Sequence, residues 1–239
     1  MRLELRDVWA APPGVAEPVV RALSLDLSAG DWVALGGANG CGKTTLLLVA
    51  AGLLVPTRGT RRIDGLEGSG AARVATILQD PSVQLFAPTV AEEIGLTALH
   101  LGFAADRIDR AVRRWSETLG LEADLGRSPR ELSAGRQQLV LLAAALASEP
   151  DLLVADEAGA HLDAPTRARV LDVLNAESSR GLAILWATQD GSERRAAARA
   201  CELRRSDSGE SLLVSWQEAE IPPAALDATR FEEIGRAHV

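Results

Sequence analysis

The chain has 239 residues, a formal net charge of −8, 47% hydrophobic residues and two cysteines. This length and apolar content support a large domain with a buried core, and two cysteines cannot form a disulfide framework. An acidic chain binds nucleic acid poorly because phosphate contacts require clustered Lys and Arg, so no nucleic-acid partner is expected.

The first ten residues, MRLELRDVWA, lack the basic, apolar and small-residue order of a signal peptide. The longest apolar stretches, such as 139–147, are far too short to span a bilayer. We therefore expect a cytoplasmic protein with reduced Cys41 and Cys201. Any work at a membrane then requires another subunit as the anchor.

Strand-like and helix-like segments alternate along most of the chain. Alternating or short apolar runs predict strands, and apolar residues spaced by three or four predict helices. The expected strands are 3–9, 19–27, 32–35, 60–63, 73–78, 151–155, 182–188, 201–203 and 211–216, the last two as a hairpin. The expected helices are 46–54, 89–100, 104–119, 133–147 and 164–179. This order indicates a parallel α/β sheet with an antiparallel β portion at the N-terminus.

A helical insertion is expected at 80–132, after the strand 73–78. It opens with a Pro-containing loop, DPSVQLFAP, at 80–88. Thr89 and Glu92 then fit a capping box, which predicts a helix start.

A glycine-rich stretch between the strand 32–35 and the next helix matches GxxxxGK[ST], the phosphate loop of NTPases. Its glycines let backbone N–H groups close around phosphate oxygens, and the helix N-terminus adds its dipole. Lys43 is expected to reach the β and γ phosphates of ATP, and Thr44 to ligate Mg²⁺. The predicted nucleotide-binding residues are Gly37, Asn39, Gly40, Cys41, Gly42, Lys43, Thr44 and Thr45. The alternative is a glycine turn that binds nothing.

Lys43 is the one lysine among 25 basic residues. A chain that otherwise uses arginine keeps lysine where the motif prescribes it, although chance is the alternative explanation. A compact ammonium on a flexible stem suits this position, and a planar guanidinium does not replace it.

Two carboxylates end a second apolar strand, in the segment LLVADE at 152–157. A carboxylate at the C-terminal end of a parallel strand faces the ligand crevice. We expect Asp156 to hold Mg²⁺, directly or through water, and Glu157 to polarise the attacking water. The alternative is that both cap the following helix.

Five elements in a fixed order resemble the nucleotide-binding subunits of ABC transporters. They are the phosphate loop, Gln79 after a strand, LSAGR at 132–136, Asp156-Glu157, and AHLD at 160–163. The resemblance implies the ABC ATPase fold: a P-loop core with a parallel sheet, an antiparallel β portion and a helical subdomain. It also implies a dimer with a second ABC ATPase subunit. In that dimer Asp163 lies at the interface, and the signature residues of one subunit meet the nucleotide of the other. The signature residues are Ser133, Ala134, Gly135 and Arg136.

The segment QDPSVQLFAPTVAEEI at 79–94 more narrowly resembles the ATPases of energy-coupling-factor importers, which serve vitamins, cobalt and nickel. This resemblance implies that Gln79 contacts Mg²⁺ and the attacking water. It also implies that the QLF segment lies near the groove for a transmembrane coupling helix. The alternative for Leu85 and Phe86 is a place in the core.

The family's switch histidine follows the strand after the acidic pair, where this chain has Gln189. The three histidines, at 100, 161 and 238, cannot fill that place. Glutamine can hydrogen-bond a γ phosphate but cannot become cationic. We therefore expect Gln189 to act in catalysis as a weakened switch, with slow hydrolysis or an unequal share of it in a heterodimer.

Other positions also depart from the family pattern. The region 10–13 offers no aromatic residue to stack on adenine, and nearby Trp9 is expected in the core. Ala134 stands for a usual glycine, Arg136 for a polar or acidic residue, and Ala158-Gly159 for Pro-Thr. His161 is expected to make a surface or interface contact.

Residues 1–216 are expected to form one ABC nucleotide-binding domain, with the helical subdomain at about 80–147, and residues 217–239 a C-terminal tail. The favoured function is the ATP-hydrolysing subunit of an importer, at the cytoplasmic face of the membrane, with transmembrane partner subunits. The alternative is a weakly hydrolysing, regulatory half of a heterodimer. A soluble ABC ATPase of translation or DNA repair is disfavoured, because such proteins usually carry tandem cassettes or long coiled coils.

Overall fold

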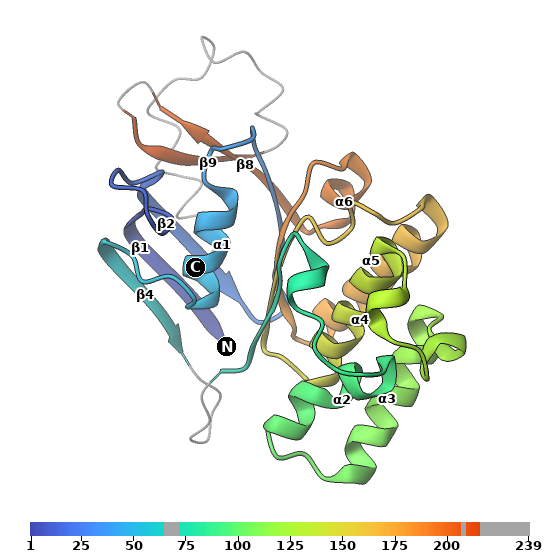
Figure 1. Ribbon diagram of the computed structural model, residues 1–239. Coiled ribbons are helices and arrows are strands. Elements are labelled where there is room, and N and C mark those ends of the chain that lie inside the picture. The colour runs from blue at the N-terminus through green and yellow to red at the C-terminus, as the bar shows by residue number, and fades with distance from the viewer. Residues whose placement is uncertain (65–71, 207–208, 216–239) are drawn as a thin grey trace.

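A six-stranded sheet forms the centre of the computed structural model, which describes residues 1–64, 72–206 and 209–215 (Figure 1). Its strand order is β5-β6-β7-β3-β8-β9, and the first five strands run parallel. The strands are β3 (Trp32–Gly36), β5 (Val74–Ile77), β6 (Leu152–Asp156), β7 (Ala183–Ala187), β8 (Arg199–Arg205) and β9 (Ser211–Ser215). β9 pairs antiparallel with β8, which confirms the predicted hairpin.

A smaller antiparallel sheet packs beside the first. It contains β1 (Arg2–Ala10), β2 (Val20–Ser28) and β4 (Arg58–Asp64) in the order β2-β1-β4. Helix α1 (Lys43–Ala51) lies between the two sheets (Figure 1). One hydrophobic core joins them, and it includes Leu3, Leu5, Val33, Leu35, Leu46 and Val49.

The remaining helices lie on the other side of the parallel sheet. They are α2 (Val90–His100), α3 (Ala105–Leu119), α4 (Ala134–Ala147), α5 (Ala164–Ser179) and α6 (Gly191–Ala196), with 3-10 turns at Pro81–Val83, Glu122–Asp124 and Pro129–Glu131. Helices α4, α5 and α6 cover the sheet, and α2 and α3 pack against α4 (Figure 1).

A second hydrophobic core lies between the parallel sheet and these helices. Successive residues of β6 alternate between the two cores: Leu152 and Val154 face the core between the sheets, and Leu153 and Ala155 face the core under the helices. All residues of β3, β6 and β7 are buried, which explains their continuous apolar runs.

Most predicted elements are confirmed, with differences at their ends. The Thr89–Glu92 capping box forms and opens α2. Helix α1 begins at Lys43, inside the phosphate loop, and ends before Gly52, whose left-handed conformation stops it. Helix α6 was not predicted. Residue 216 and the predicted tail 217–239 lie outside the described residues. In the described part of the chain, every helix is too short or too polar to cross a bilayer.

Candidate nucleotide site

The phosphate loop connects β3 to α1, at the C-terminal end of an inner strand of the parallel sheet, between β7 and β8. Gly42 precedes α1 and offers no side-chain cap to its first turn. Other helices of the chain have such a cap, supplied by Thr89, Ser133, Asp163 and Asp190. The N–H groups at the start of α1 therefore remain for an anion, which the helix dipole also favours.

Two glycines of the loop are required by its backbone. Gly37 has φ 136°, and a Cβ there would lie 2.6 Å from the Leu203 carbonyl oxygen. Gly42 has φ 109°, and a Cβ there would lie 3.0 Å from Val20 Cγ2. Residues with a side chain rarely adopt such φ values, so only glycine fits at these two positions of the loop.

Lys43 is buried inside the loop, with 7% of its surface exposed. Its Nζ donates to the carbonyl oxygens of Gly37, at 2.8 Å, and Ala38, at 3.1 Å. Both acceptors are neutral, so a negatively charged phosphate is the stronger partner for this ammonium. The Cys41 side chain packs against the apolar core, so the part of this residue suited to phosphate is its backbone.

Four polar side chains lie close together beside the loop. Thr44 Oγ1 donates to Asp156 Oδ2 at 2.6 Å, and Gln79 Nε2 donates to Glu157 Oε2 at 3.3 Å. Hydroxyl, carboxylate and amide oxygens are ligands that Mg²⁺ accepts, and this ion usually takes one or two protein ligands plus phosphates and water. Thr44, Asp156 and the amide oxygen of Gln79 therefore fit an Mg²⁺ bound together with a nucleotide.

Glu157 has a left-handed backbone, with φ 52°. Its N–H donates to Ala187 O at 3.0 Å, and its carbonyl accepts from Ala160 N at 3.0 Å. A non-glycine residue is held in this conformation only where its surroundings over-determine it, and such residues cluster at functional sites. The turn aims the carboxylate toward Gln79 rather than along the strand.

Gln189 follows β7 and reaches the phosphate loop. Its Nε2 donates to the Gly37 carbonyl at 2.8 Å, and Arg194 Nη2 lies 3.4 Å from its Oε1. The residue at the family's switch position is therefore in direct contact with the loop that holds Lys43.

The signature residues open α4. Ser133 accepts from Arg136 N at 3.4 Å as the helix cap, and Ser133 and Ala134 are exposed. A Cβ on Gly135 would lie 2.5 Å from His161 O, so only glycine fits there. The Arg136 side chain contacts the carboxylate of Asp124 and donates to Gly120 O at 2.7 Å. That side chain is thus held inside its own chain.

Several side chains of the site had no sequence signal. Gln138 is 2% exposed, contacts Glu157 O at 3.5 Å and accepts from His161 N at 3.3 Å, which ties α4 to the loop after β6. Glu93 is 4% exposed and accepts from the backbone N–H groups of Phe86 and Ala87. Trp9 is not in the core: it is half-buried, with Arg58 5.5 Å from its ring centroid.

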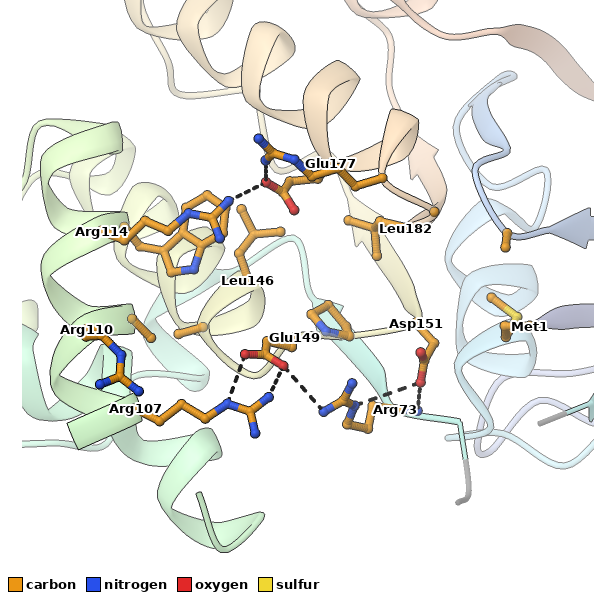
Figure 2. A pocket seen from close by; sticks show the side chains of 17 residues that line it. Met1, Arg73, Arg107, Arg110, Arg114, Leu146, Glu149, Asp151, Glu177 and Leu182 are labelled. Atoms are coloured by element: carbon orange, nitrogen blue, oxygen red, sulfur yellow. Dashed lines mark hydrogen bonds and ion pairs between the residues drawn. The ribbon is translucent and has the colours of Figure 1, made fainter. Parts of the chain in front are cut away.

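A cavity of about 550 Å³ lies away from the phosphate loop, at the N-terminal ends of the parallel strands (Figure 2). Arg73, Asp151 and Leu182 line it, and each comes just before a parallel strand. Ligands of open α/β sheets bind at the C-terminal ends of the strands, so this cavity is not the candidate nucleotide site. Ion pairs across the cavity join α3 to the body of the protein, such as Arg114–Glu177 at 2.6 Å (Figure 2).

Comparison with known proteins shows the family of the chain. A family profile described as ABC transporter matches residues 20–160. The chain belongs to the ABC transporter ATP-binding family.

Among its relatives, the cobalt import ATP-binding protein CbiO of Syntrophus aciditrophicus is 35% identical over 79% of this chain and 70% of its own length. The energy-coupling factor transporter ATP-binding protein EcfA1 of Halalkalibacterium halodurans is 30% identical over 89% of the chain and 80% of its own length. EcfA2 of Methanospirillum hungatei is 33% identical over 79% of the chain, but this match spans only about half, 49%, of the relative.

The fold of this ABC ATPase also matches solved structures. An ATP-binding subunit of an ABC transporter superposes with a TM-score of 0.79, covering 98% of this chain and 99% of its own, at 23% identity. A dimeric ATP-binding cassette in a post-hydrolysis state with ADP and phosphate superposes with a TM-score of 0.76, covering 87% of this chain and 96% of its own, at 23% identity. These likenesses confirm the ABC ATPase fold.

Proposed function

We propose that this ABC ATPase binds Mg-ATP at the phosphate loop, hydrolyses it, and drives an importer of the energy-coupling-factor type. Lys43 and the N-terminus of α1 hold the phosphates, while Thr44, Asp156 and Gln79 hold Mg²⁺. Glu157 polarises the attacking water. The relatives named for cobalt import and for energy-coupling-factor transport support this type of importer.

The loop at 79–88 is the observation that carries the coupling proposal. At one end Gln79 contacts Glu157, and at the other Phe86 is 71% exposed. The loop is held between these ends: Gln84 Oε1 accepts from Leu78 N at 2.7 Å, and Glu93 accepts from Phe86 N at 2.8 Å. An ordered connection that ends in an exposed aromatic ring can transmit a change at the nucleotide to a transmembrane partner that covers the ring.

A second ABC ATPase subunit completes the proposed site. Ser133, Ala134 and Gly135 would contact the nucleotide of that subunit, and exposed Asp163 would lie at the interface. The ion pair between Arg136 and Asp124 would hold the signature residues in place. The complex would work at the cytoplasmic face of the membrane, anchored by its transmembrane subunits.

A weakly hydrolysing, regulatory half of a heterodimer is the second candidate. The contact of Gln189 with Gly37 favours it, because an amide at this position cannot carry the positive charge of a protonated histidine. The exposed methyl group of Ala134 also favours the regulatory candidate, because it would face the partner's nucleotide.

Turnover of ATP by the purified chain, alone and with the membrane proteins that co-purify with it, separates the two candidates. The motor proposal expects turnover that Glu157→Gln abolishes while ATP binding remains. Arg113→Met changes an exposed arginine of α3 and serves as the control for an unrelated substitution. A wild-type chain that binds ATP but shows no turnover in any assembly would reject the motor proposal and leave the regulatory one.

A further inference from the structure

Arg167, in the first turn of α5, contacts two different loops at once. Its Nη1 lies 3.0 Å from Asp190 Oδ2, and its Nε lies 3.4 Å from Glu193 Oε1. Its Nη2 donates to Leu162 O at 2.9 Å and to Gly159 O at 3.4 Å. One guanidinium therefore joins the loop after β6 to the loop after β7 through Nη1 and Nη2, in a planar geometry that lysine lacks. Its Nε faces Glu193 as an ion pair without a hydrogen bond.

Glu193 is the most enclosed member of this group, with 2% of its surface exposed. Its Oε2 accepts from Trp186 Nε1 at 2.7 Å, and its Oε1 faces Arg167. A Cβ on Gly159 would lie 1.8 Å from that same Oε1. The carboxylate thus occupies the space that a side chain at Gly159 would fill, and the loop after β6 packs directly on it.

The two loops joined in this way carry different parts of the nucleotide site. The loop after β6 begins at Glu157 and ends at Asp163. The loop after β7 holds Gln189, whose Nε2 donates to the Gly37 carbonyl of the phosphate loop. We propose that Arg167 and Glu193 are a positioning pair, which couples the placement of Glu157 and Asp163 to the contact between Gln189 and the phosphate loop.

The physical basis is that neither loop can shift alone without separating the buried Glu193 carboxylate from Arg167, whose side chain is 21% exposed. The Glu193 carboxylate is out of water, and Arg167 is the cation that faces it. Breaking a buried pair leaves an uncompensated charge, so the loops move together with the pair intact. A phosphate that draws Lys43 from Gly37 alters the acceptor that Gln189 shares, and the pair carries this change to Glu157.

The first test separates positioning from plain stability with one single and one double variant. Arg167→Met should lower both the melting temperature and kcat. Arg167→Met/Glu193→Gln removes the charge together with its partner and should restore most of the melting temperature. Its kcat should stay about ten-fold or more below wild type, with KM for ATP within about two-fold, because misplaced catalytic groups cost rate more than binding. Recovery of kcat together with the melting temperature would overturn the proposal.

The second test does not depend on turnover, so it can fail independently of the proposed ATP hydrolysis. Hydrogen exchange is measured at residues 157–163 and 188–193 with and without Mg-AMPPNP, at protein concentrations where the chain is monomeric. In wild type and in the Arg113→Met control, the analogue should slow exchange in both segments. In the double variant it should slow exchange at 188–193 alone. Equal protection of both segments in the double variant would overturn the coupling.

Discussion

Lys43 and Gln189 donate to one acceptor, the carbonyl oxygen of Gly37, each at 2.8 Å. One donor comes from α1 and the other from the loop after β7, so this oxygen is where the phosphate loop meets the switch position. A carbonyl has two lone pairs and can accept both bonds. Anything that withdraws one donor changes the environment of the other.

The Lys43 ammonium fits closely between two backbone carbonyl oxygens, so Lys43→Arg should weaken nucleotide binding. The two carbonyl oxygens that surround Nζ lie at 2.8 and 3.1 Å, and a planar guanidinium is too wide to replace a point donor there. We expect affinity for a fluorescent ATP analogue to fall about ten-fold or more, equivalent to about 1.4 kcal/mol or more. Arg113→Lys, on an exposed face of α3, is the reverse exchange and should leave affinity unchanged. Equal affinity of Lys43→Arg and wild type would contradict the assignment of the loop.

Gln189→His should raise turnover, since it restores a side chain that can become cationic beside the phosphate loop. We expect kcat to rise about five- to ten-fold, below the roughly 10²–10⁴-fold that a fully positioned acid–base group contributes, because Ala134 and the other departures of the site remain. Gln189→Ala removes the amide and should give no rise. If Gln189→His also gives none, the limit lies elsewhere, and Ala134→Gly tests the signature position with the same assay.

Leu85 and Phe86 are neighbours with opposite surroundings, 1% and 71% exposed. Leu85→Ala should cost about 2–5 kcal/mol of unfolding free energy, because it opens a cavity in the core. Phe86→Ala should change stability by less than about 0.5 kcal/mol, as is usual for surface substitutions. It should nevertheless weaken co-purification of the membrane partner. Undiminished capture by Phe86→Ala would contradict a role for this ring in coupling.

The parts of the site that the sequence predicted are those with a local pattern. The phosphate loop, the capping box at Thr89 and the carboxylates after β6 each lie within a few residues of a recognisable strand or helix end. Burial of β3, β6 and β7 on both faces gave continuous apolar runs, which predicted these strands, and their alternation with helices indicated the parallel sheet. For Leu85 and Phe86 the sequence left core and groove open; the structure buries Leu85 in the core and leaves Phe86 exposed.

The parts that the sequence missed depend on contacts between distant residues. Arg167 meets Glu193 across 26 positions, and Gln138 meets Glu157 across 19, and neither pair follows a helix or strand period. The left-handed backbone of Glu157 is equally invisible, because glutamate does not favour φ > 0. Helix α6 escaped prediction because its six residues, GSERRA, are too few for an apolar period.

The lowered pKa of Asp190 predicts that the free energy of unfolding falls as the pH is lowered. The Ser192 hydroxyl, the backbone N–H groups of Glu193 and Ser192, and the charge of Arg167 together hold the pKa of Asp190 below its usual range. A carboxyl whose pKa is lowered by folding stabilises the protein above its unfolded pKa of about 3.9, and this contribution is lost as pH falls through the folded pKa. Asp190→Asn should therefore reduce stability near pH 7 but lose less of it on acidification.

Urea denaturation between about pH 3 and pH 7 checks this, with the two stability curves expected to converge at the acid end. Asp163 retains its own lowered pKa, through the hydroxyl and N–H of Thr166, so the variant keeps part of the dependence. Curves that stay parallel over the whole range would show that Asp190 contributes no such linkage.

Gly159 and Glu193 should respond to substitution as one unit. A methyl group at Gly159 would lie 1.8 Å from Glu193 Oε1, so Gly159→Ala must displace a buried carboxylate or its own loop. We expect a cost of about 1–3 kcal/mol, typical of overpacking in an interior. In a Glu193→Ala background the same methyl group finds free space, and its cost should fall by at least about 1 kcal/mol.

The double-mutant cycle measures this difference by chemical denaturation of wild type, the two single variants and the double variant. Gly126→Ala is the matched control, because a Cβ there meets no atom within 4 Å and should be indifferent to Glu193. Additive costs for Gly159→Ala and Glu193→Ala would contradict the packing of Glu193 on Gly159. A non-additive result would explain why this chain has glycine where the family commonly has threonine: the smaller residue leaves room for the carboxylate that Arg167 holds.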